Sequence, residues 1–439
     1  MNKQLNFSAL TALVLSSMLG AGIFNLPQNM AEVASPVALI IGWCITGCGI
    51  ILLALALLLL SKIKPNLDGG IFIYAQEGFG KLIGFCSAWG YWLCAVIANA
   101  SYLVIVCSAM GFFIDSPQYI IFGDGNTWQS ILFASILLWV IHSLVLKGVR
   151  TAASINIIAT LGKLIPLGIF IIVALHAFKY SYFYFDFTGI SLGKSVWQQV
   201  KDSMLVTLWV FIGIEGAVVM SSRARYKKDI SRSTIVALLI ALGIYLLISL
   251  LSLGLTPRAE LAKMHNPSMA GLMNDLIGPW GSIIIITGLI ISVCGAYLSW
   301  TIMAAEVPII AVKNGTFKLH NLQIQNNYKA QKVSLYLTDL SVQFCLIIIW
   351  LTGCNYNTLL TIASEMILVP YLLVGAYLFK VTKKLKKPIM SIIAIGASIY
   401  GVWLLYASGP LNILLSMLFY IPGVLIFLLI NKINPQKPC

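Results

Sequence analysis

The chain alternates long apolar runs with short polar segments, and this pattern predicts helices that cross a bilayer. Each run is close to the roughly 20 residues that a helix needs to span the hydrocarbon core. Twelve spans are expected, at 8–30, 36–60, 83–114, 127–146, 152–176, 196–222, 232–255, 279–312, 333–352, 356–379, 388–407 and 410–430. Little chain remains between them. The predicted fold class is therefore an all-α membrane protein of about twelve transmembrane helices, forming one domain over 1–439.

Composition supports this class. Hydrophobic residues make up 59% of the chain and charged residues only 10%, whereas soluble domains carry about 25% charged residues. The polar start, Met1 to Lys3, leads directly into the first apolar run with no small-residue cleavage site. We therefore expect no cleavable signal peptide.

The net charge of +14 reflects membrane topology rather than nucleic-acid binding. Of the 28 Lys and Arg residues, 22 fall in segments on the side of the amino terminus, and four fall in the opposite loops. Cytoplasmic loops carry such an excess, whereas a nucleic-acid binder clusters basic residues on one soluble face. We expect an integral membrane protein with both termini in the cytoplasm, surrounded by lipid and not bound to nucleic acid.

Two predicted spans contain helix-weakening residues near their middles. Span 1 carries Gly20, Gly22 and Pro27, and span 6 carries Gly213 and Gly216. Glycine weakens a helix, and proline cannot donate to its hydrogen-bond ladder. Gly-interrupted helices at matching places in two halves are the sequence pointer to a transporter's binding site. The alternative is that these glycines only allow close helix packing.

The positions of the interruptions divide the chain into two blocks of five spans. Repeat one is expected at 8–177 and repeat two at 196–380, with two extra helices at 388–430. Because each block holds an odd number of spans, the second is inverted relative to the first. This arrangement predicts a five-plus-five inverted repeat with broken helices 1 and 6.

An interrupted span exposes peptide groups that must face protein or a polar cavity. At the first interruption, the N–H groups of Ala21, Gly22 and Ile23 would point at an anion, with the dipole of the following half-helix behind them. A carboxylate suits that position, and freed carbonyls would accept hydrogen bonds from an α-ammonium group. The predicted site is thus a receptor for the backbone of an amino acid.

Four ionisable residues lie at membrane depth, where such groups are functional candidates. Glu215 lies in the second interruption, Lys163 in span 5, Glu306 in span 8 and Glu365 in span 10. Glu215 is either functional or the hydrogen-bond partner of a group such as Tyr91. Lys163 either braces the broken helix or releases a proton during transport. Glu306 and Glu365 are weaker candidates that could equally serve helix packing.

Trp209 and Trp300 lie at membrane depth, and tryptophan faces attract cations. Together with the acids they favour a positively charged substrate. His142 and His176 are isolated, and the cysteines lack metal-ligand spacing, so we expect no metal and no cofactor. Neither an enzyme's catalytic motif nor the repeated polar residues of a channel pore is present, and the predicted protein is not an enzyme.

Five segments together resemble the amino acid–polyamine–organocation superfamily, and within it the basic amino acid/polyamine antiporters. They are GAGIFNLPQNMA (20–31), LDGG (67–70), GYW (90–92), LWVFIGIEGA (208–217) and WTIMAAE (300–306). The resemblance covers nearly the whole chain and is strongest to arginine–ornithine antiporters. It implies the LeuT-like fold with alternating access, in a bacterial inner membrane.

The resemblance also implies roles for individual residues. Ala21, Gly22 and Ile23 would bind the substrate carboxylate, and Asn99 would contact its side-chain cation. Trp209 would stack on the substrate and gate it, and Trp300 would wall the pocket. Glu215 with Tyr91 would couple gating to charge. Lys163 matches a lysine that replaces a sodium ion in some relatives.

The exchanged pair remains open at this point. Arginine–ornithine antiport is the main expectation, with arginine–agmatine antiport and proton-coupled uptake of a basic amino acid as alternatives. Arginine–agmatine antiporters carry a serine where this chain has Ala21, which makes agmatine the less favoured substrate. A homodimer is also left open.

Overall fold

The computed structural model describes residues 7–67, 70–147, 152–215, 227–316 and 327–433. The helices in these ranges are α1 (Phe7–Met18), α2 (Gly22–Val33), α3 (Pro36–Ile63), α4 (Ile71–Phe79), α5 (Lys81–Ile114), α6 (Trp128–Leu146), α7 (Ala152–Ala177), α8 (Tyr180–Phe185), η1 (Ile190–Leu192), α9 (Val196–Trp209), α11 (Lys227–Ser252), α12 (Arg258–Leu261), α13 (Ser268–Ile277), α14 (Pro279–Lys313), α15 (Asn327–Thr352), α16 (Tyr356–Lys384), α17 (Pro388–Ser408) and α18 (Pro410–Ile433). Among the described residues the one β feature is an isolated bridge between Ser116 and Tyr119.

Ten of these helices are long and apolar enough to cross a membrane. Each coincides with one of the twelve predicted spans. The two remaining predicted spans, 8–30 and 196–222, are those expected to be interrupted. The first consists of α1 and α2, and the described part of the second consists of α9 and the turns that follow it. The prediction of an all-helical membrane protein is confirmed.

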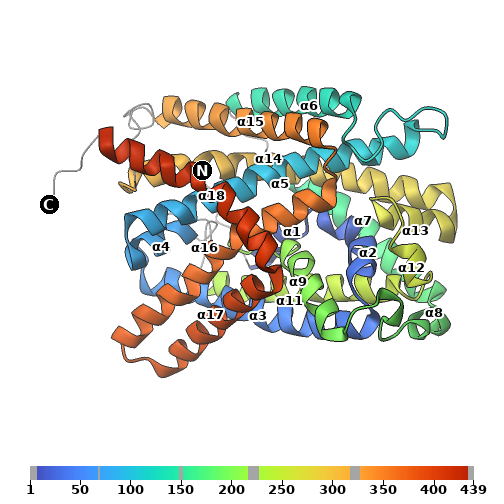
Figure 1. Ribbon diagram of the computed structural model, residues 1–439, viewed down its shortest axis with the longest axis horizontal. Coiled ribbons are helices and arrows are strands. Elements are labelled where there is room, and N and C mark those ends of the chain that lie inside the picture. Colours follow the sequence, from blue (N-terminus) through green and yellow to red (C-terminus); the bar gives the residue numbers. More distant parts are fainter. Residues whose placement is uncertain (1–6, 68–69, 148–151, 216–226, 317–326, 434–439) are drawn as a thin grey trace.

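The long helices lie side by side along the horizontal axis of Figure 1, with the short helix α4 at one end and α8, α12 and α13 at the other. α5 lies at the centre: 89% of its most apolar stretch is buried, against 11% for α18. Small residues let α5 approach its neighbours closely. At Gly90, for example, a Cβ atom would lie 2.7 Å from the carbonyl oxygen of Met366 on α16.

In each predicted repeat, a short helix meets the third span at a sharp corner, and the two corners are similar. α4 turns into α5 at Gly80, and α13 turns into α14 at Gly278, and both glycines have a positive φ (92° and 77°). A second glycine follows within the first turn of each long helix. These glycines are Gly84 in α5 and Gly281 in α14. A Cβ atom added at Gly84 would lie 2.7 Å from the Cα of Gln76, and one added at Gly281 would lie 2.4 Å from the carbonyl oxygen of Met273. The same corner is thus built twice, at corresponding places.

A buried polar pair joins α6 to α15. His142 Nδ1 lies 2.6 Å from Asp339 Oδ2, and the two side chains are only 3% and 2% exposed. The rings of Tyr336 and Trp139 pack around the histidine, with centroids at 4.4 Å and 5.1 Å. The expectation that His142 is isolated was therefore wrong, and Asp339 was missed as an ionisable residue at membrane depth. The partners lie 197 positions apart, so only the packing of the two helices brings them together.

Replacing Asp339 by leucine should destabilise the protein, because it leaves His142 Nδ1 buried without a partner at a cost of about 1–3 kcal/mol. The double variant His142→Leu/Asp339→Leu should lose less stability than the single variant, since both polar groups are then gone. Thermal unfolding in detergent, followed by tryptophan fluorescence, measures both. A single variant that unfolds at the wild-type temperature would show that the pair contributes nothing.

Candidate functional site

Span 1 is unwound at Leu19, Gly20 and Ala21, between the end of α1 and the start of α2. Ala21 provides no side-chain cap, and the first amides of an α-helix have no partner within the helix. Pro27 also lacks the N–H that would bond the Ile23 carbonyl. The sequence placed the interruption around Gly20 and Gly22, and the structure shows that the chain is helical again from Gly22. The first amides of α2 therefore lie at this break.

Span 6 loses its helix after Trp209. Turns with hydrogen bonds between residues three apart follow. The amide of Phe211 donates to the carbonyl of Leu208 at 2.9 Å, and the amide of Ile212 donates to the carbonyl of Trp209 at 3.2 Å. Gly213 then has φ 115°, which only glycine adopts easily. The interruption predicted at Gly213 and Gly216 thus begins earlier, at Val210, and Gly216 lies outside the described ranges.

The two breaks lie against each other. A Cβ atom at Gly213 would lie 2.6 Å from the carbonyl oxygen of Ser17, and Ser17 Oγ donates to the Gly213 carbonyl at 3.3 Å. On α11, the Tyr245 hydroxyl lies 2.9 Å from the carbonyl oxygen of Met18 and 2.7 Å from that of Val210. This one hydroxyl therefore serves a freed carbonyl in each break.

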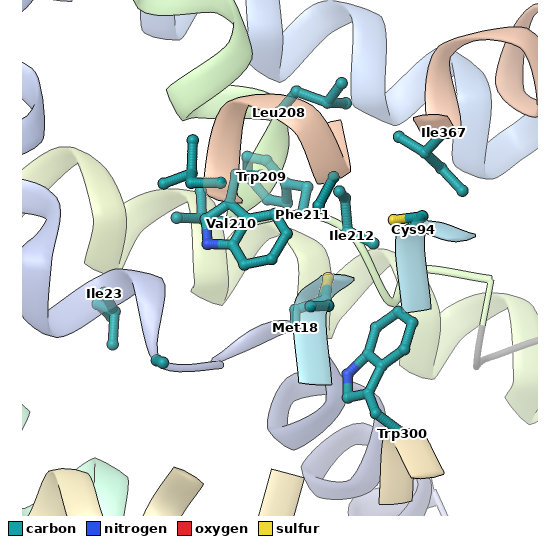
Figure 2. Packing of buried hydrophobic residues seen from close by; sticks show 14 of the residues in the cluster. Met18, Ile23, Cys94, Leu208, Trp209, Val210, Phe211, Ile212, Trp300 and Ile367 are labelled. Atoms are coloured by element: carbon teal, nitrogen blue, oxygen red, sulfur yellow. The ribbon is translucent and has the colours of Figure 1, made fainter. Parts of the chain in front are cut away.

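A small cavity lies at this meeting point. Of the predicted site residues, the cavity is lined by Ala21, Gly22, Ile23, Trp209 and Trp300. Figure 2 shows the two indole rings approaching from different helices, with Met18 and Ile23 on either side of the unwound turn. The free space is about 10 Å³, close to the room of one water molecule. In this conformation an amino acid does not fit.

Trp209 closes the cavity on one side. A Cβ atom at Gly22 would lie 2.7 Å from its Nε1 atom, so the indole lies directly on the first residue of α2. Nε1 also donates to the Tyr356 hydroxyl on α16 at 3.0 Å. Trp209 is therefore held between the two elements that it would have to leave for the cavity to open.

Glu215 lies near the cavity without lining it. Its carboxylate accepts hydrogen bonds from Tyr91 on α5 (3.2 Å), Tyr371 on α16 (2.9 Å) and the Gly213 amide (3.2 Å). The side chain is 3% exposed. Tyr91 in turn contacts Trp300, with ring centroids 6.5 Å apart. The acid thus joins the second break to α5 and α16.

Lys163 and Asn99 also lie behind the cavity wall. Lys163 Nζ, whose residue is 1% exposed, donates to the carbonyl of Ser16 at 2.9 Å and lies 3.2 Å from its hydroxyl. It holds the last turn of α1 before the break. Asn99 is fully buried. Its Nδ2 faces Thr301 Oγ1 at 3.5 Å, and its Oδ1 has no partner among the described residues.

The two weaker candidates lie elsewhere. Glu365 on α16 is buried, and its Oε1 atom has no hydrogen-bond partner among the described residues. Glu306 on α14 is exposed. Neither lines the cavity.

A network of side-chain amides covers the site beyond Tyr356. Asn266, which precedes α13, donates to Gln28 on α2 and Asn357 on α16, each at 3.2 Å. Gln28 and Asn357 both donate to Glu32, at 2.9 Å and 3.3 Å. A polar cavity of about 140 Å³ lies among these residues and is also lined by Tyr356. Tyr356 and Trp209 therefore separate an inner cavity from an outer one.

Arg258 forms hydrogen bonds that hold the carboxyl-terminal end of α2 in place. Nη1 donates to the Ala31 carbonyl at 2.8 Å, and Nε donates to Asp186 Oδ2 at 2.8 Å. Burial alone would raise the pKa of Asp186, but hydrogen bonds from Ser191 and Arg258 outweigh it and hold the pKa below its usual value. Asp186 therefore stays charged, and the loop between α8 and η1 stays attached to α2 through Arg258.

Sequence reasoning missed the tyrosines of this site. Tyr245, Tyr356 and Tyr371 bond to the breaks, to Trp209 and to Glu215, and Tyr102 lines the cavity. Tyrosine is common at membrane interfaces, so its presence in an apolar run is a weak signal. Tyr102, Tyr245 and Tyr371 lie inside spans 3, 7 and 10 rather than at their ends, and this was the only available sign. Tyr356 is the first residue of span 10 and gave no such sign.

Two interrupted helices that meet around a closed central cavity, inside a bundle of long apolar helices, define a membrane transporter. The chain belongs to the family described as Amino acid permease, whose profile matches residues 5–434. The predicted family relationship and the expectation of a transporter rather than an enzyme are confirmed.

Individual relatives cover nearly the full chain. The protein called "Putative arginine/ornithine antiporter" in Escherichia coli K12 is 64% identical over 98% of this chain and 93% of its own length. An arginine/ornithine antiporter of Pseudomonas aeruginosa is 42% identical, over 97% of this chain and 90% of its own. An arginine/agmatine antiporter of Chlamydia pneumoniae is 43% identical, over 96% and 89%.

Tyr245→Phe should slow transport by roughly tenfold without unfolding the protein. The buried Val210 carbonyl then loses the Tyr245 hydroxyl as its donor, at a cost of about 1–3 kcal/mol, while the Met18 carbonyl keeps the Gly20 amide at 2.8 Å. Uptake of labelled arginine into vesicles containing the purified variant measures this. Tyr400→Phe is the matched control, since the Tyr400 hydroxyl is also buried but lies on α17, where it bonds to neither break. Equal rates in both variants would mean that the Tyr245 hydroxyl does not support the breaks.

Asp186→Asn should destabilise the protein by about 1.5–3 kcal/mol at neutral pH, because a charged hydrogen bond to Arg258 is weakened. The lowered pKa means that the carboxylate stabilises the fold above the ordinary Asp pKa of about 3.9 and loses its effect as pH falls through its folded value. The gap between wild type and variant should thus be constant from pH 7 to 5 and shrink toward pH 3. Thermal unfolding measures it.

Asp202→Asn is the control for this variant, since the Asp202–Lys194 pair at 2.6 Å is half exposed on its lysine side and surface pairs contribute little. A gap for Asp186→Asn that is already closed at pH 5 would contradict a lowered pKa.

Proposed function

We propose that this protein exchanges arginine for ornithine across the membrane by alternating access. The observation that carries the proposal is the cavity between the two breaks, where bare amides of α2 stand opposite two tryptophans. Such a site has one end for a carboxylate and one for a cation. The name of the 64% identical relative supports arginine and ornithine as the pair.

The carboxylate of the substrate binds the amides of Ala21, Gly22 and Ile23. These N–H groups begin α2, so the helix dipole adds to their attraction for an anion. The α-ammonium group bonds to freed carbonyls of the breaks. These contacts recognise the part that arginine and ornithine have in common.

The side-chain cation lies between Trp209 and Trp300 and reaches Asn99. A cation over a desolvated indole gains about 2 kcal/mol or more. The Oδ1 atom of Asn99, buried without a partner, accepts a hydrogen bond from a guanidinium or ammonium group. Glu215 adds a negative charge nearby without contacting the substrate.

Trp209 is the gate. Because the closed cavity holds about one water, the indole must leave Gly22 and Tyr356 before a substrate binds. Glu215, bonded to the same break as well as to Tyr91 and Tyr371, couples that movement to α5 and α16. Lys163 acts as a brace: its bond to the Ser16 carbonyl keeps α1 in place while α2 moves.

The chain consists of two inverted repeats, 8–177 and 196–380, and 388–430 adds two outer helices. The repeated glycine corners at Gly80 and Gly278 and the two breaks support this division. Twelve crossings, with both termini in the cytoplasm, agree with the excess of basic residues in the loops on that side.

Arginine–agmatine exchange is the second candidate, since a 43% identical relative carries that name. Ala21 disfavours it by resemblance, because those antiporters bear a serine at this position. The two exchanges differ in charge. Arginine and ornithine are both monocations, whereas agmatine is a dication, so its exchange for arginine moves one charge.

Arginine uptake into vesicles loaded with ornithine should therefore be insensitive to membrane potential. For the agmatine exchange, 100 mV would change the driving force by about 2.3 kcal/mol. Initial rates at imposed potassium potentials of opposite sign measure this. Vesicles without internal amine should show no uptake, and the Trp209→Leu and Glu215→Gln variants show whether the flux uses this site.

A steep voltage dependence would refute the ornithine exchange. Uptake into empty vesicles driven by a pH gradient would favour proton coupling instead. Wild-type flux in both variants would mean that the substrate binds elsewhere.

A further inference from the structure

An apolar groove runs along the outside of the helix bundle where α4, α16 and α17 meet. Its volume is about 640 Å³, which is within the range of pockets that hold small ligands. It is lined by Phe79 of α4, by Ala376, Phe379, Lys380 and Lys383 of α16, and by Ile395, Ser398, Ile399 and Val402 of α17. It is separate from the transport site, since the two share no lining residue.

The wall that α17 contributes is one continuous apolar stripe. Ile395, Ile399 and Val402 follow each other at helical spacing and are 44%, 62% and 57% exposed. The one hydroxyl between them, Ser398 Oγ, is already bonded to the Ala394 carbonyl at 2.8 Å. This wall suits a hydrocarbon chain and provides nothing for a polar ligand.

The other end of the groove is strongly basic. Lys380 and Lys383 line it, and Lys384, Lys386 and Lys387 follow at the turn into α17. None of the ion pairs in the described part of the chain involves these lysines. Glu77 on α4 is the acid close by, and it leaves a clear excess of positive charge.

Lys380 is held in position for a ligand. Its Nζ donates to the Gly78 carbonyl at the end of α4 (2.7 Å) and lies 5.7 Å from the centre of the Phe79 ring. An ammonium group has three donors, so further hydrogens remain for an anionic oxygen. The lysine is thus fixed at the mouth of the groove.

The distance from the lysines to the far end of the apolar stripe matches the distance from the headgroup of a lipid to the inner part of its acyl chain. α17 begins at Pro388, beside the lysines, and Val402 lies 14 residues further on, about 21 Å along the helix. An anion at the lysines and an apolar chain along the stripe would therefore lie at headgroup and hydrocarbon depth in a core about 30 Å thick. Basic pockets between transmembrane helices bind anionic headgroups.

We propose that this groove binds one anionic phospholipid, with its phosphate on Lys380 and Lys383 and an acyl chain along Ile395, Ile399 and Val402. The bound lipid holds α16 against α4 and α17. α16 also carries Tyr356 and Tyr371, the partners of Trp209 and Glu215. Occupation of the groove therefore stabilises the helix that contacts both gating residues.

Lipid binding tests the proposal independently of transport. Phosphatidylglycerol and phosphatidylcholine are titrated onto the purified protein in detergent, and bound lipid is counted by native mass spectrometry. Wild type should bind one phosphatidylglycerol tightly and phosphatidylcholine weakly. Lys380→Gln/Lys383→Gln should weaken phosphatidylglycerol binding roughly 30-fold, since each lysine near an anionic headgroup contributes about fivefold.

Two further variants separate the groove from general surface charge. Lys147→Gln/Lys332→Gln removes two exposed charges at the end of α6 and on α15, at the opposite edge of the bundle from α17 (Figure 1), and should change binding less than threefold. Ile399→Trp keeps every charge but fills the groove, and should lower binding at least tenfold. Glycerol phosphate, the headgroup without chains, should not displace the lipid.

The proposal is overturned if the Lys380/Lys383 variant binds phosphatidylglycerol like wild type, or if the Lys147/Lys332 variant loses as much binding. Displacement by glycerol phosphate alone would overturn the acyl-chain part. These results do not depend on which amino acid is transported.

Discussion

The structure depends on how peptide groups are satisfied where a helix stops inside a bilayer. Hydrocarbon offers no hydrogen bonds, so every freed carbonyl needs a protein partner or a polar cavity. Here the partners come from two helices: Tyr245 on α11 serves both breaks, and Lys163 on α7 holds α1. Gly213, in the second break, has no side chain and so lets this break lie on the first. The remaining bare amides begin α2 and face the cavity.

This arrangement explains why the site is both firm and able to open. Its frame of hydrogen bonds connects fixed helices to the ends of the breaks. The groups that close it, Trp209 on Gly22 and Tyr356 above it, are held by one hydrogen bond and by packing. Weak closure above a well-bonded frame is what a carrier needs, because its gate must release in every cycle.

Residues of α16 contact the central site, the outer amide network and the groove on the outside of the bundle. Tyr356 and Tyr371 contact the gate and Glu215, Asn357 belongs to the outer amide network, and Lys380 lies at the lipid-facing groove. α16 thus contacts Trp209 and Glu215, belongs to the outer amide network and lines the groove.

The sequence by itself determined the class, the spans and the place of both breaks. Apolar length reports membrane crossing, and Gly20, Gly22, Pro27 and Gly213 act on their own helices, so these signals are local. Ten spans appear as continuous helices and the other two as the expected interruptions. Five residues that the sequence analysis named as substrate-binding line one cavity: Ala21, Gly22, Ile23, Trp209 and Trp300.

Only the tertiary structure decided which side chains meet across the bundle. His142 with Asp339, Tyr245 with two carbonyls, and Tyr371 with Glu215 join residues far apart in the chain. A tyrosine or an aspartate in an apolar run shows nothing of its partner, because helix rotation and packing set the contact. The unwound turn likewise shifted, since the exact ends of α1 and α9 depend on the bonds that their neighbours provide.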